Sequence, residues 1–535
     1  MSSLLERRAG WVAALSLISA LAAIRAVECS WAQVTRPFWQ DECRHNFAIL
    51  EATSLADTVS RTAYMSQPIL EYAARRLFWF PVFGHQERGL RLPSFAYYLA
   101  LVLGGVLLTA GVLRRRGHPP AYALLGAFLA GLWMTGKPDE PWYGCEARHY
   151  ALVSLLSLWW FHLAILAERP SPVARWIVSL AFANTHFFAL PLIAAVSLLD
   201  AVAAWRDRNA RGAAAVLAGA LAITVVTIGV NHAAWRELTG NPPGARIAWG
   251  QGILDAGRIW WGYVRYVRLP VAAFVVWAGL LLVARRRDAG RLLLFALVFL
   301  PLFLLALRVR SDYLFSSRYY TPFFGGAFVT LVLALDRSRA FVVWLTGKMR
   351  LLPAAGRAAG WVAVAALVVM FKAGPACRDI VRWRGQVAVG SQNGSPTFHM
   401  YEAIKREDVP VLVISELCWN DVTHRLYLGF IGAPFRREVR LVRARGCPGG
   451  GPEVRAEIGR FLSDYPRGLV VLDQTDTGEK VCGALPASPL GGGVRVTQAP
   501  DGLCAWFIRG ARTAADIRRA ARAVEFRSLA WWYAR

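Results

Sequence analysis

Long apolar runs, separated by short polar segments rich in arginine, fill the first 374 residues of the chain. A run of about 17 to 25 apolar residues is long enough to cross a bilayer as a helix. The run Trp176–Trp205 is too long for one ordinary span, and the polar sequence Asn184-Thr185-His186 in its middle predicts a tight helical hairpin. With this run counted twice, the pattern predicts about eleven membrane-spanning helices. The predicted spans are Gly10–Val27, Pro93–Leu113, Ala121–Thr135, Tyr150–Ala167, Trp176–Trp205, Ala213–Val230, Val271–Ala284, Leu292–Leu307, Thr321–Leu335 and Trp361–Phe371.

The C-terminal part of the chain has the pattern of a soluble domain. Val409–Ser415 and Gly468–Asp473 are short apolar runs typical of buried strands, and Leu503–Arg509 is a later strand pattern. Glu453–Tyr465 has helical periodicity and lies between Arg437–Val442 and the second of these runs. This alternation predicts a small α/β domain with a partly parallel sheet.

These patterns divide the chain into two domains. Residues 1–374 are predicted to form a polytopic membrane domain with a long first outer loop, residues 28–92. Within that loop, Ile69–Phe80 mixes apolar residues with paired arginines, which predicts an interfacial helix on the bilayer surface. Residues 375–535 are predicted to form an extracytoplasmic α/β domain. The predicted fold class is an α-helical polytopic membrane protein with a C-terminal α/β domain.

Composition and charge support this topology. The chain is 56% hydrophobic with 22 Trp, which excludes an ordinary soluble protein. A net charge of +26 would suit a nucleic-acid-binding protein, but the arginines are distributed between the spans rather than gathered on one soluble face. Clusters such as Arg114-Arg115-Arg116 and Arg285-Arg286-Arg287 fall on one side of the predicted topology, as the positive-inside rule requires.

The positive-inside pattern places the N-terminus in the cytoplasm and the C-terminal domain outside. The excess of Arg over Lys indicates a bacterial chain, and we expect it in the bacterial cytoplasmic (inner) membrane as a multi-pass protein. The outer loops also hold arginines, for example Arg88 and Arg91. Either the orientation is weakly encoded or these outer arginines bind anions.

Seven of the eight cysteines fall in segments predicted to lie outside, and Cys29 lies at the outer end of the first span. Disulfides persist in oxidising compartments, so this distribution supports the same orientation. Cys43 and Cys145 are candidates for a bridge between two outer loops, and the last four cysteines allow three connectivities. The alternative is that these cysteines are unpaired and buried.

An adjacent acidic pair, Asp41-Glu42, follows the first span. Ionisable groups near a bilayer are costly and tend to be functional. A carboxylate in a partly desolvated pocket suits the role of a general base, and the neighbouring Arg44 and His45 can tune its protonation. The alternative is a solvated acidic pair on a loop.

Five short motifs, in this order, resemble those of the GT-C glycosyltransferases, in the protein-O-mannosyltransferase-like and aminoarabinose-transferase-like branches. They are Asp41-Glu42-Cys43-Arg44-His45, then Ser66–Tyr72 with Phe83–Ser94, Glu146-Ala147-Arg148-His149-Tyr150, Thr185–Leu190, and Arg318-Tyr319-Tyr320-Thr321-Pro322. GT-C enzymes are multi-spanning membrane proteins that use polyprenyl-phosphate sugars as donors. The motifs cover about 280 residues and leave the C-terminal domain out.

The resemblance implies roles for individual residues. Asp41 would be the general base, with Glu42 as second choice, in a direct displacement that inverts the anomeric centre. Leaving phosphate needs positive charge nearby, which arginine supplies in a planar fork. The implied donor-phosphate and substrate-binding residues are Arg148, Arg318, Tyr319, Glu146, His45 and Arg91, with Arg310 as a weaker candidate. For any single arginine the alternative is lipid headgroup anchoring, and His186 is expected to be a hydrogen-bonded packing residue.

No spaced histidine and carboxylate motif with metal geometry is present, so no metal site is predicted. Some GT-C members use a divalent cation and others do not. Asp41, Glu42, Asp139 and Glu140 have the oxygen ligands that such an ion prefers.

The sequence therefore predicts a glycosyltransferase that moves a sugar from a polyprenyl-phosphate donor to a lipid, glycan or protein hydroxyl at the outer face of the membrane. The alternative is a transporter or flippase of a lipid-linked anionic substrate. Transporters place ionisable residues near the bilayer midplane, often within repeated halves. Here the midplane segments are almost uncharged and no repeat is visible, which favours surface chemistry.

Overall fold

The structure is a computed structural model of the chain. It describes residues 2–35, 40–63, 67–84, 87–135, 145–167, 171–240, 321–333, 335–336, 396–415, 428, 437–443, 452–474, 488–490, 492–498 and 505–524. Contacts divide the chain into two units. The first comprises Met1–Val34, Ala52–Pro81 and Arg91–Gly385, and the second comprises Thr35–Glu51, Val82–Leu90 and Gln386–Arg535. Each unit is described by itself.

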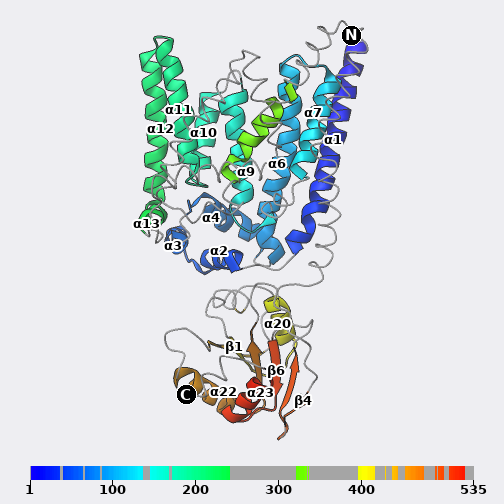
Figure 1. The fold of residues 1–535 in the computed structure, drawn as a ribbon, viewed down its shortest axis with the longest axis vertical. Helices are drawn as coiled ribbons and strands as arrows, with labels where there is room; N and C mark the ends of the chain where they lie inside the picture. The colour runs from blue at the N-terminus through cyan, green and yellow to red at the C-terminus, as the bar shows by residue number, and fades with distance from the viewer. Residues whose placement is uncertain are drawn as a thin grey trace, which may run out of the picture. The chain divides into compact units, whose positions relative to one another are not determined.

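The first unit is helical (Figure 1). Its longer helices are α1 (Ser2–Thr35), α6 (Glu87–Arg115), α7 (Pro120–Thr135), α9 (Tyr150–Phe161), α10 (Pro172–Ala183), α11 (Ala189–Arg206) and α12 (Ala210–Val230). Helix α9 continues into the π-helix η3 (His162–Leu166), and α12 is followed by α13 (His232–Gly240). A further apolar helix spans Thr321–Leu333.

Four helical stretches are long and apolar enough to cross a membrane, namely Ala9–Trp31, Gly89–Arg115, Ala189–Arg206 and Ala210–Val230. Shorter apolar helices span Pro120–Thr135, Tyr150–Leu166, Pro172–Ala183 and Thr321–Leu333. The described helices of the first unit therefore include several with the length and apolar character of membrane spans, as the hydropathy predicts. The total of eleven spans stays a prediction, because Val271–Ala284, Leu292–Leu307 and Trp361–Phe371 lie outside the described residues.

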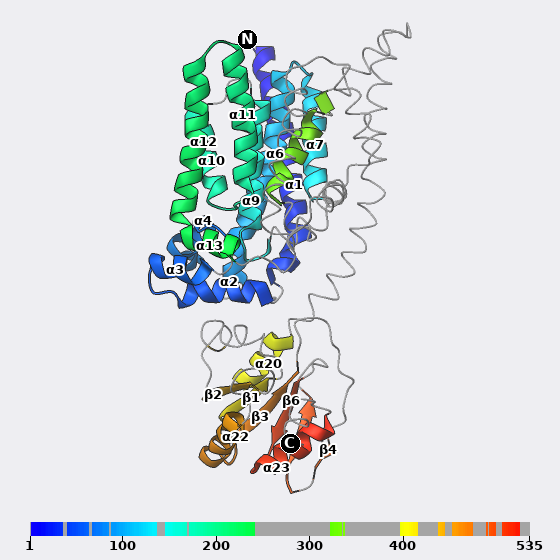
Figure 2. The ribbon, with the colours of Figure 1, turned by 60° about the vertical axis from the view of Figure 1, so that its left-hand side comes forward.

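The predicted break in Trp176–Trp205 is confirmed. Helix α10 ends at Ala183 and α11 begins at Ala189. Serine and proline fix the start of α10, because the Ser171 side chain accepts a hydrogen bond from the backbone N–H of Ala174 and Pro172 opens the first turn. Helices α11 and α12 then lie side by side (Figure 2).

The segment 28–92, predicted as the first outer loop, is largely helical where the structure describes it. Helix α1 continues to Thr35 and α6 already begins at Glu87, so the helices take both ends of the segment 28–92. Between them lie α2 (Gln40–Glu51), α3 (Leu55–Thr62), α4 (Leu70–Ala74), the π-helix η2 (Arg75–Trp79) and α5 (Phe80–Phe83). Hydropathy did not predict these helical extensions of α1 and α6, because charged residues interrupt the apolar runs there and hydropathy ends a span where polar residues begin.

Apolar side chains point away from the first unit along several helices. Leu17 on α1 is 61% exposed, and Leu221 and Val225 on α12 are 64% and 62% exposed. Exposed apolar faces of this length are unfavourable in water but suit contact with lipid tails. The packing inside the unit is close. Gly325 lets the helix Thr321–Leu333 approach α9, because a Cβ atom at this position would lie 2.2 Å from the carbonyl oxygen of Ser157.

A buried ionic cluster joins the C-terminal end of α6 to Asp336. The Arg116 guanidinium lies 2.8 Å from one carboxylate oxygen of Asp336, and Nε2 of His118 lies 2.7 Å from the other. Tyr122 also donates a hydrogen bond to the carbonyl of Leu335 at 2.5 Å. The arginine-rich segments that follow α6 and Asp336 therefore begin at the same end of the helices, as the topology predicts.

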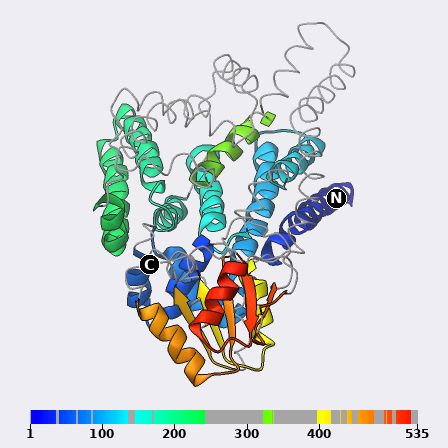
Figure 3. The same cartoon turned by 60° about the horizontal axis from the view of Figure 1, so that its bottom comes forward.

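The second unit contains a six-stranded sheet in the order β2-β1-β3-β6-β5-β4 (Figure 3). The strands are β1 (Val411–Ser415), β2 (Val439–Arg443), β3 (Leu469–Asp473), β4 (Ser488–Pro489), β5 (Arg495–Gln498) and β6 (Ala505–Arg509). Strands β2, β1 and β3 are parallel, and β6, β5 and β4 join antiparallel to this group. The predicted partly parallel α/β sheet is thus confirmed, although the sequence pattern did not reveal β4 and β5.

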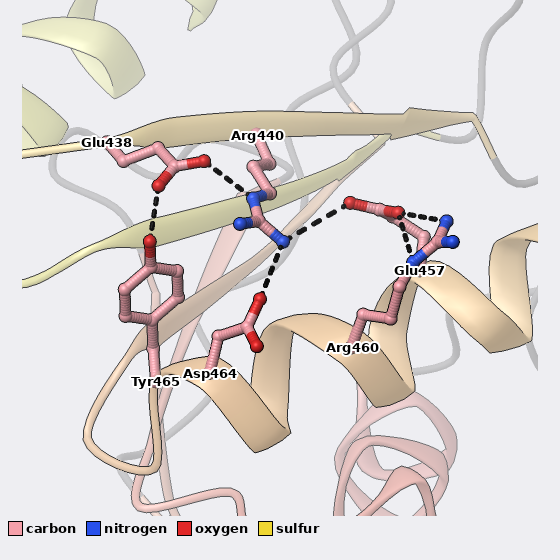
Figure 4. Close-up of polar contacts among 6 residues, drawn as sticks. All are labelled: Glu438, Arg440, Glu457, Arg460, Asp464 and Tyr465. Atoms are coloured by element: carbon pink, nitrogen blue, oxygen red, sulfur yellow. Dashed lines mark hydrogen bonds and ion pairs between the residues drawn. The ribbon is translucent and has the colours of Figure 1, made fainter.

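Helices α22 (Pro452–Asp464) and α23 (Ala514–Ala523) cover one face of this sheet, while α20 (Pro396–Lys405) precedes β1. Phe461 and Ile517 from the two helices share a buried cluster with Leu472 and Trp506 from the strands. Outside this core, exposed ion pairs tie the edge strand β2 to α22 (Figure 4). Arg440 lies 2.6 Å from Glu438 and 3.3 Å from Asp464, and such exposed pairs contribute little stability.

Gly325→Ala is expected to destabilise the first unit by about 1–3 kcal/mol, because the added methyl group would force α9 and the helix Thr321–Leu333 apart. The matched control is Gly111→Ala in α6, where a Cβ atom meets nothing within 4 Å. Thermal unfolding of the detergent-solubilised variants measures the difference. Equal melting temperatures for the two variants would contradict the close packing at Gly325.

Candidate functional site

Buried charged side chains gather near the start of α6 and the start of α9. Glu71, Arg75, Arg91 and Glu146 are at most 1% exposed, and Arg148 is 7% exposed. Charged residues are almost never fully buried unless they are paired, and near a membrane they indicate function. All five belong to the first unit.

Glu71 and Arg75 form the centre of this cluster. The Arg75 Nε atom lies 2.7 Å from Oε1 of Glu71, one helical turn earlier. Arg75 also begins the π-helix η2, a form of helix that is rare and often found at functional sites. On the same helical stretch, Leu77 and Phe78 are 52% and 64% exposed. Glu71 and Arg75 therefore face inward beside Tyr72, while Leu77 and Phe78 face outward.

This orientation refines the prediction for Ile69–Phe80. The predicted helix is present, and its exposed apolar face suits a bilayer surface, which stays a prediction. The sequence pattern alone placed Glu71 and Arg75 in no buried site. The signal that could have found them is the spacing of four residues with Glu before Arg, the favoured arrangement of a helical ion pair.

Arg75 connects this pair to the segment that precedes α9. Its Nη2 atom donates to the hydroxyl of Ser94 at 2.7 Å and to the carbonyl of Arg148 at 3.4 Å. The Ser94 hydroxyl donates in turn to the same carbonyl at 3.2 Å. Two buried donors therefore fix the main chain at Arg148.

The Arg148 side chain has its own partners. Its Nη1 atom lies 3.3 Å from Oε1 of Glu146, and its guanidinium carbon lies 4.8 Å from the ring centre of Tyr150. The Tyr150 ring also contacts the ring of His149, with centroids 4.4 Å apart. Arg148 and Glu146, two residues of one predicted motif, are thus brought together, and the guanidinium of Arg148 lies over an aromatic ring.

His186 lies in the turn between α10 and α11 and is 2% exposed. Its Nδ1 atom accepts a hydrogen bond from the backbone N–H of Phe188 at 3.1 Å, and its ring lies 5.5 Å from that of His149. Burial, together with the positive charge of Arg148, lowers the pKa of His186 to about 3. The imidazole is therefore neutral at physiological pH.

Two asparagines attach the segment before α4 to the α10–α11 turn and to the end of α12. The backbone N–H of Ile69 donates to the side chain of Asn231 at 2.7 Å, and that of Leu70 donates to the carbonyl of Asn184 at 3.0 Å. The side chains of Asn231 and Asn184 bond each other at 2.8 Å. These bonds hold the start of the Glu71–Arg75 helix against the turn that carries His186.

The acidic pair Asp41-Glu42 lies in the first turn of α2 and belongs to the second unit. Glu42 and His45 are buried, at 0% and 4% exposed, so neither is the solvated loop residue of the alternative interpretation. The side chain of Asn46 donates to the carbonyl of Glu42 at 2.7 Å within the helix. The side chain of Asp41 lies outside the described residues.

Several predicted residues stay predictions, because they also lie outside the described residues. They are Arg318, Tyr319, Arg310, Asp139 and Glu140, with the side chains of Arg44 and Cys43. Cys29 and Cys145 are buried, and the bridge between Cys43 and Cys145 is not tested. Within the described ranges, no three His, Cys, Asp or Glu side chains are grouped so that they could hold a metal ion.

Comparisons with known proteins give little guidance. No protein-family model matches the chain, and no curated protein matches it in sequence. One solved structure that resembles it is the crystal structure of the Archaeoglobus fulgidus oligosaccharyltransferase in complex with zinc and sulfate. The two share 13% sequence identity at a TM-score of 0.44, over 85% of this chain and 68% of that chain. A similarity this low does not establish a common fold.

Arg75→Ala is expected to destabilise the first unit by about 3–5 kcal/mol, because it leaves the buried Glu71 without its cationic partner. The control is Arg61→Ala, which breaks an exposed pair with Asp57 and should change stability by about 0–1 kcal/mol. Thermal unfolding in detergent compares the two. If the two variants have the same melting temperature, the buried Glu71–Arg75 pair does not stabilise the first unit as proposed.

The stability of the first unit is expected to depend on Glu71 between mildly acidic and neutral pH. Burial raises the pKa of Glu71 from 4.5 to about 7, against the opposing effect of Arg75. Because the pKa of Glu71 is higher in the folded state than in the unfolded state, the folded state binds the proton of Glu71 more tightly. The stability that this difference contributes is fully present below pH 4.5 and is lost as the pH rises through about 7. The melting temperature should fall from about pH 5 to about pH 8 in the wild type and less in Glu71→Gln. Parallel pH profiles would contradict the assignment.

Proposed function

We propose that this chain is a GT-C-type glycosyltransferase that transfers a sugar from a polyprenyl-phosphate donor to a hydroxyl of a lipid, glycan or protein. The observation that carries the proposal is the buried, prearranged Arg148, with its main chain fixed by Arg75 and Ser94 and its guanidinium against Glu146 and Tyr150. A fixed arginine near the start of an apolar helix suits an anion that enters from the membrane. The motif resemblance gives that anion its identity as a lipid phosphate.

The chemistry requires such a group. In the proposed reaction, the acceptor oxygen attacks the anomeric carbon while the bond from that carbon to the phosphate oxygen breaks. Negative charge grows on the departing phosphate, and a prearranged cation stabilises it without reorganisation. Arg148 would supply this charge, with Arg91, Arg318 and Tyr319 as further donor-binding residues. The guanidinium fork binds two phosphate oxygens at once.

The acceptor hydroxyl must lose its proton in the same step. We assign the general base to Asp41, with Glu42 as second choice, because a carboxylate near an apolar environment is suited to accept this proton. The burial of Glu42 and His45 supports a desolvated setting for this helix. His45 and Glu146 would bind substrate hydroxyls. Attack opposite the leaving phosphate inverts the anomeric centre.

The distribution of charge supports an enzyme over a transporter. The buried ion pairs Glu71–Arg75, Glu146–Arg148 and Arg116–Asp336 lie beside or beyond the ends of apolar helices rather than at their centres. Transporters instead concentrate ionisable residues near the bilayer midplane. We therefore propose a reaction at the membrane surface, and the positive-inside pattern of the sequence favours the outer face of a bacterial cytoplasmic membrane.

Membranes that contain the wild type are expected to transfer label from one member of a panel of radiolabelled polyprenyl-phosphate sugars. Asp41→Asn should reduce transfer by about a hundredfold or more at equal protein level, because the general base is lost. Glu42→Gln is the neighbouring comparison and should reduce transfer less. Full activity in Asp41→Asn would overturn the base assignment. No transfer from any donor by the wild type, with lipid, glycan and peptide acceptors supplied, would favour the transporter.

A further inference from the structure

The turn between α10 and α11 leaves one buried hydrogen-bond donor unused. Because Nδ1 of His186 accepts a hydrogen bond from Phe188, the proton of the neutral ring lies on Nε2. Among the described residues, this Nε2–H group has no hydrogen-bond partner, although the side chain is only 2% exposed. Buried polar groups are nearly always hydrogen-bonded in native structures, so an unused donor requires an explanation.

A packing role does not explain this donor. The rings of Phe188 and His149 lie 5.1 and 5.5 Å from that of His186, and the packing of these rings and the Nδ1 acceptor for Phe188 make no use of the Nε2–H group. The hydrogen bond expected from the sequence is present at Nδ1, while Nε2 has no partner within the described residues.

The surroundings of His186 favour an anion. The His186 ring lies 5.5 Å from the ring of His149, the residue that directly follows Arg148 in the chain. Burial and the positive charge of Arg148 both lower the pKa of His186, so its ring is neutral at this place. Both groups donate hydrogen bonds and neither Nε2–H nor a guanidinium can accept one. Phosphate oxygens accept hydrogen bonds and carry negative charge, so they match this pair, whereas a hydroxyl would leave its own proton unsatisfied there.

We propose that Nε2–H of His186 and the guanidinium of Arg148 together bind the phosphate group of a lipid phosphate. This proposal rests on the proposed function and extends it, because it adds a neutral donor to the charge supplied by Arg148. The lipid form is favoured over free phosphate because the turn lies between two apolar helices, α10 and α11. His186 is then a ligand-binding residue rather than a residue of the core.

The test measures binding of radiolabelled undecaprenyl phosphate to the purified full chain in nanodiscs. His186→Phe keeps the ring and removes the donor, and it should weaken binding about tenfold or more. His186→Gln can place an amide N–H near the former Nε2 and should restore binding to within about threefold of wild type. Arg148→Ala should also weaken binding. The matched control is His232→Phe, which removes an exposed histidine at the start of α13 and should leave binding unchanged.

Three results would overturn the proposal. The first is wild-type affinity in His186→Phe, and the second is no binding of undecaprenyl phosphate by the wild type. The third is competition by inorganic phosphate at concentrations similar to those of the lipid, which would assign the site to free phosphate. A melting temperature for each variant separates lost binding from lost folding. Sugar transfer is measured separately. If the wild type transfers sugar and His186→Phe binds undecaprenyl phosphate as well as the wild type does, this inference is refuted while the proposed function stands.

Discussion

A carboxylate and a guanidinium that leave water must satisfy each other and must also find partners for their remaining polar atoms, because the desolvation of each ion is strongly unfavourable. Glu71 and Arg75 meet this constraint within one helical turn, and Arg75 then bonds Ser94 and the carbonyl of Arg148. The positions of three chain segments follow from it: the helix that begins at Leu70, the start of α6, and the residues before α9. The candidate anion site is built on their junction.

The same constraint explains why four residues of the α4–η2 stretch, Glu71, Arg75, Leu77 and Phe78, depart from the usual pattern. In a soluble protein its apolar residues would face inward and its charges outward. Here Leu77 and Phe78 are exposed while Glu71 and Arg75 are buried. This inversion is favourable only where the outer surroundings are themselves apolar, so the stretch is in accord with the lipid-facing surfaces of α1 and α12.

The sequence predicted the regular parts of the fold because local pattern determines them. Apolar runs gave α6, α7, α9 and the break between α10 and α11, and alternating elements gave β1, α22 and β3. The burial of Glu71 and Arg75 could not be predicted, because hydropathy assigns every charge to the surface and only tertiary contacts reverse that. Strands β4 and β5 were not predicted, because they have only two and four residues, too few to show the alternation of apolar and polar positions of a strand. The motif residues Glu146 and Arg148 were found together, while the unused donor of His186 depends on a hydrogen bond made two residues away.

Asn184 and Asn231 recognise the segment at residues 69 and 70 through its main chain alone. Asn231 accepts the N–H of Ile69, the carbonyl of Asn184 accepts that of Leu70, and the asparagine side chains bond each other. A contact of this kind does not read side-chain identity at positions 69 and 70. Those two positions can therefore accept many substitutions without displacing the helix that follows, provided that proline is avoided, since it has no N–H to donate. The asparagine side chains have no such freedom, because that of Asn231 accepts the N–H of Ile69 and is held by that of Asn184, so sequence variation in homologous chains should be concentrated on one partner of this contact.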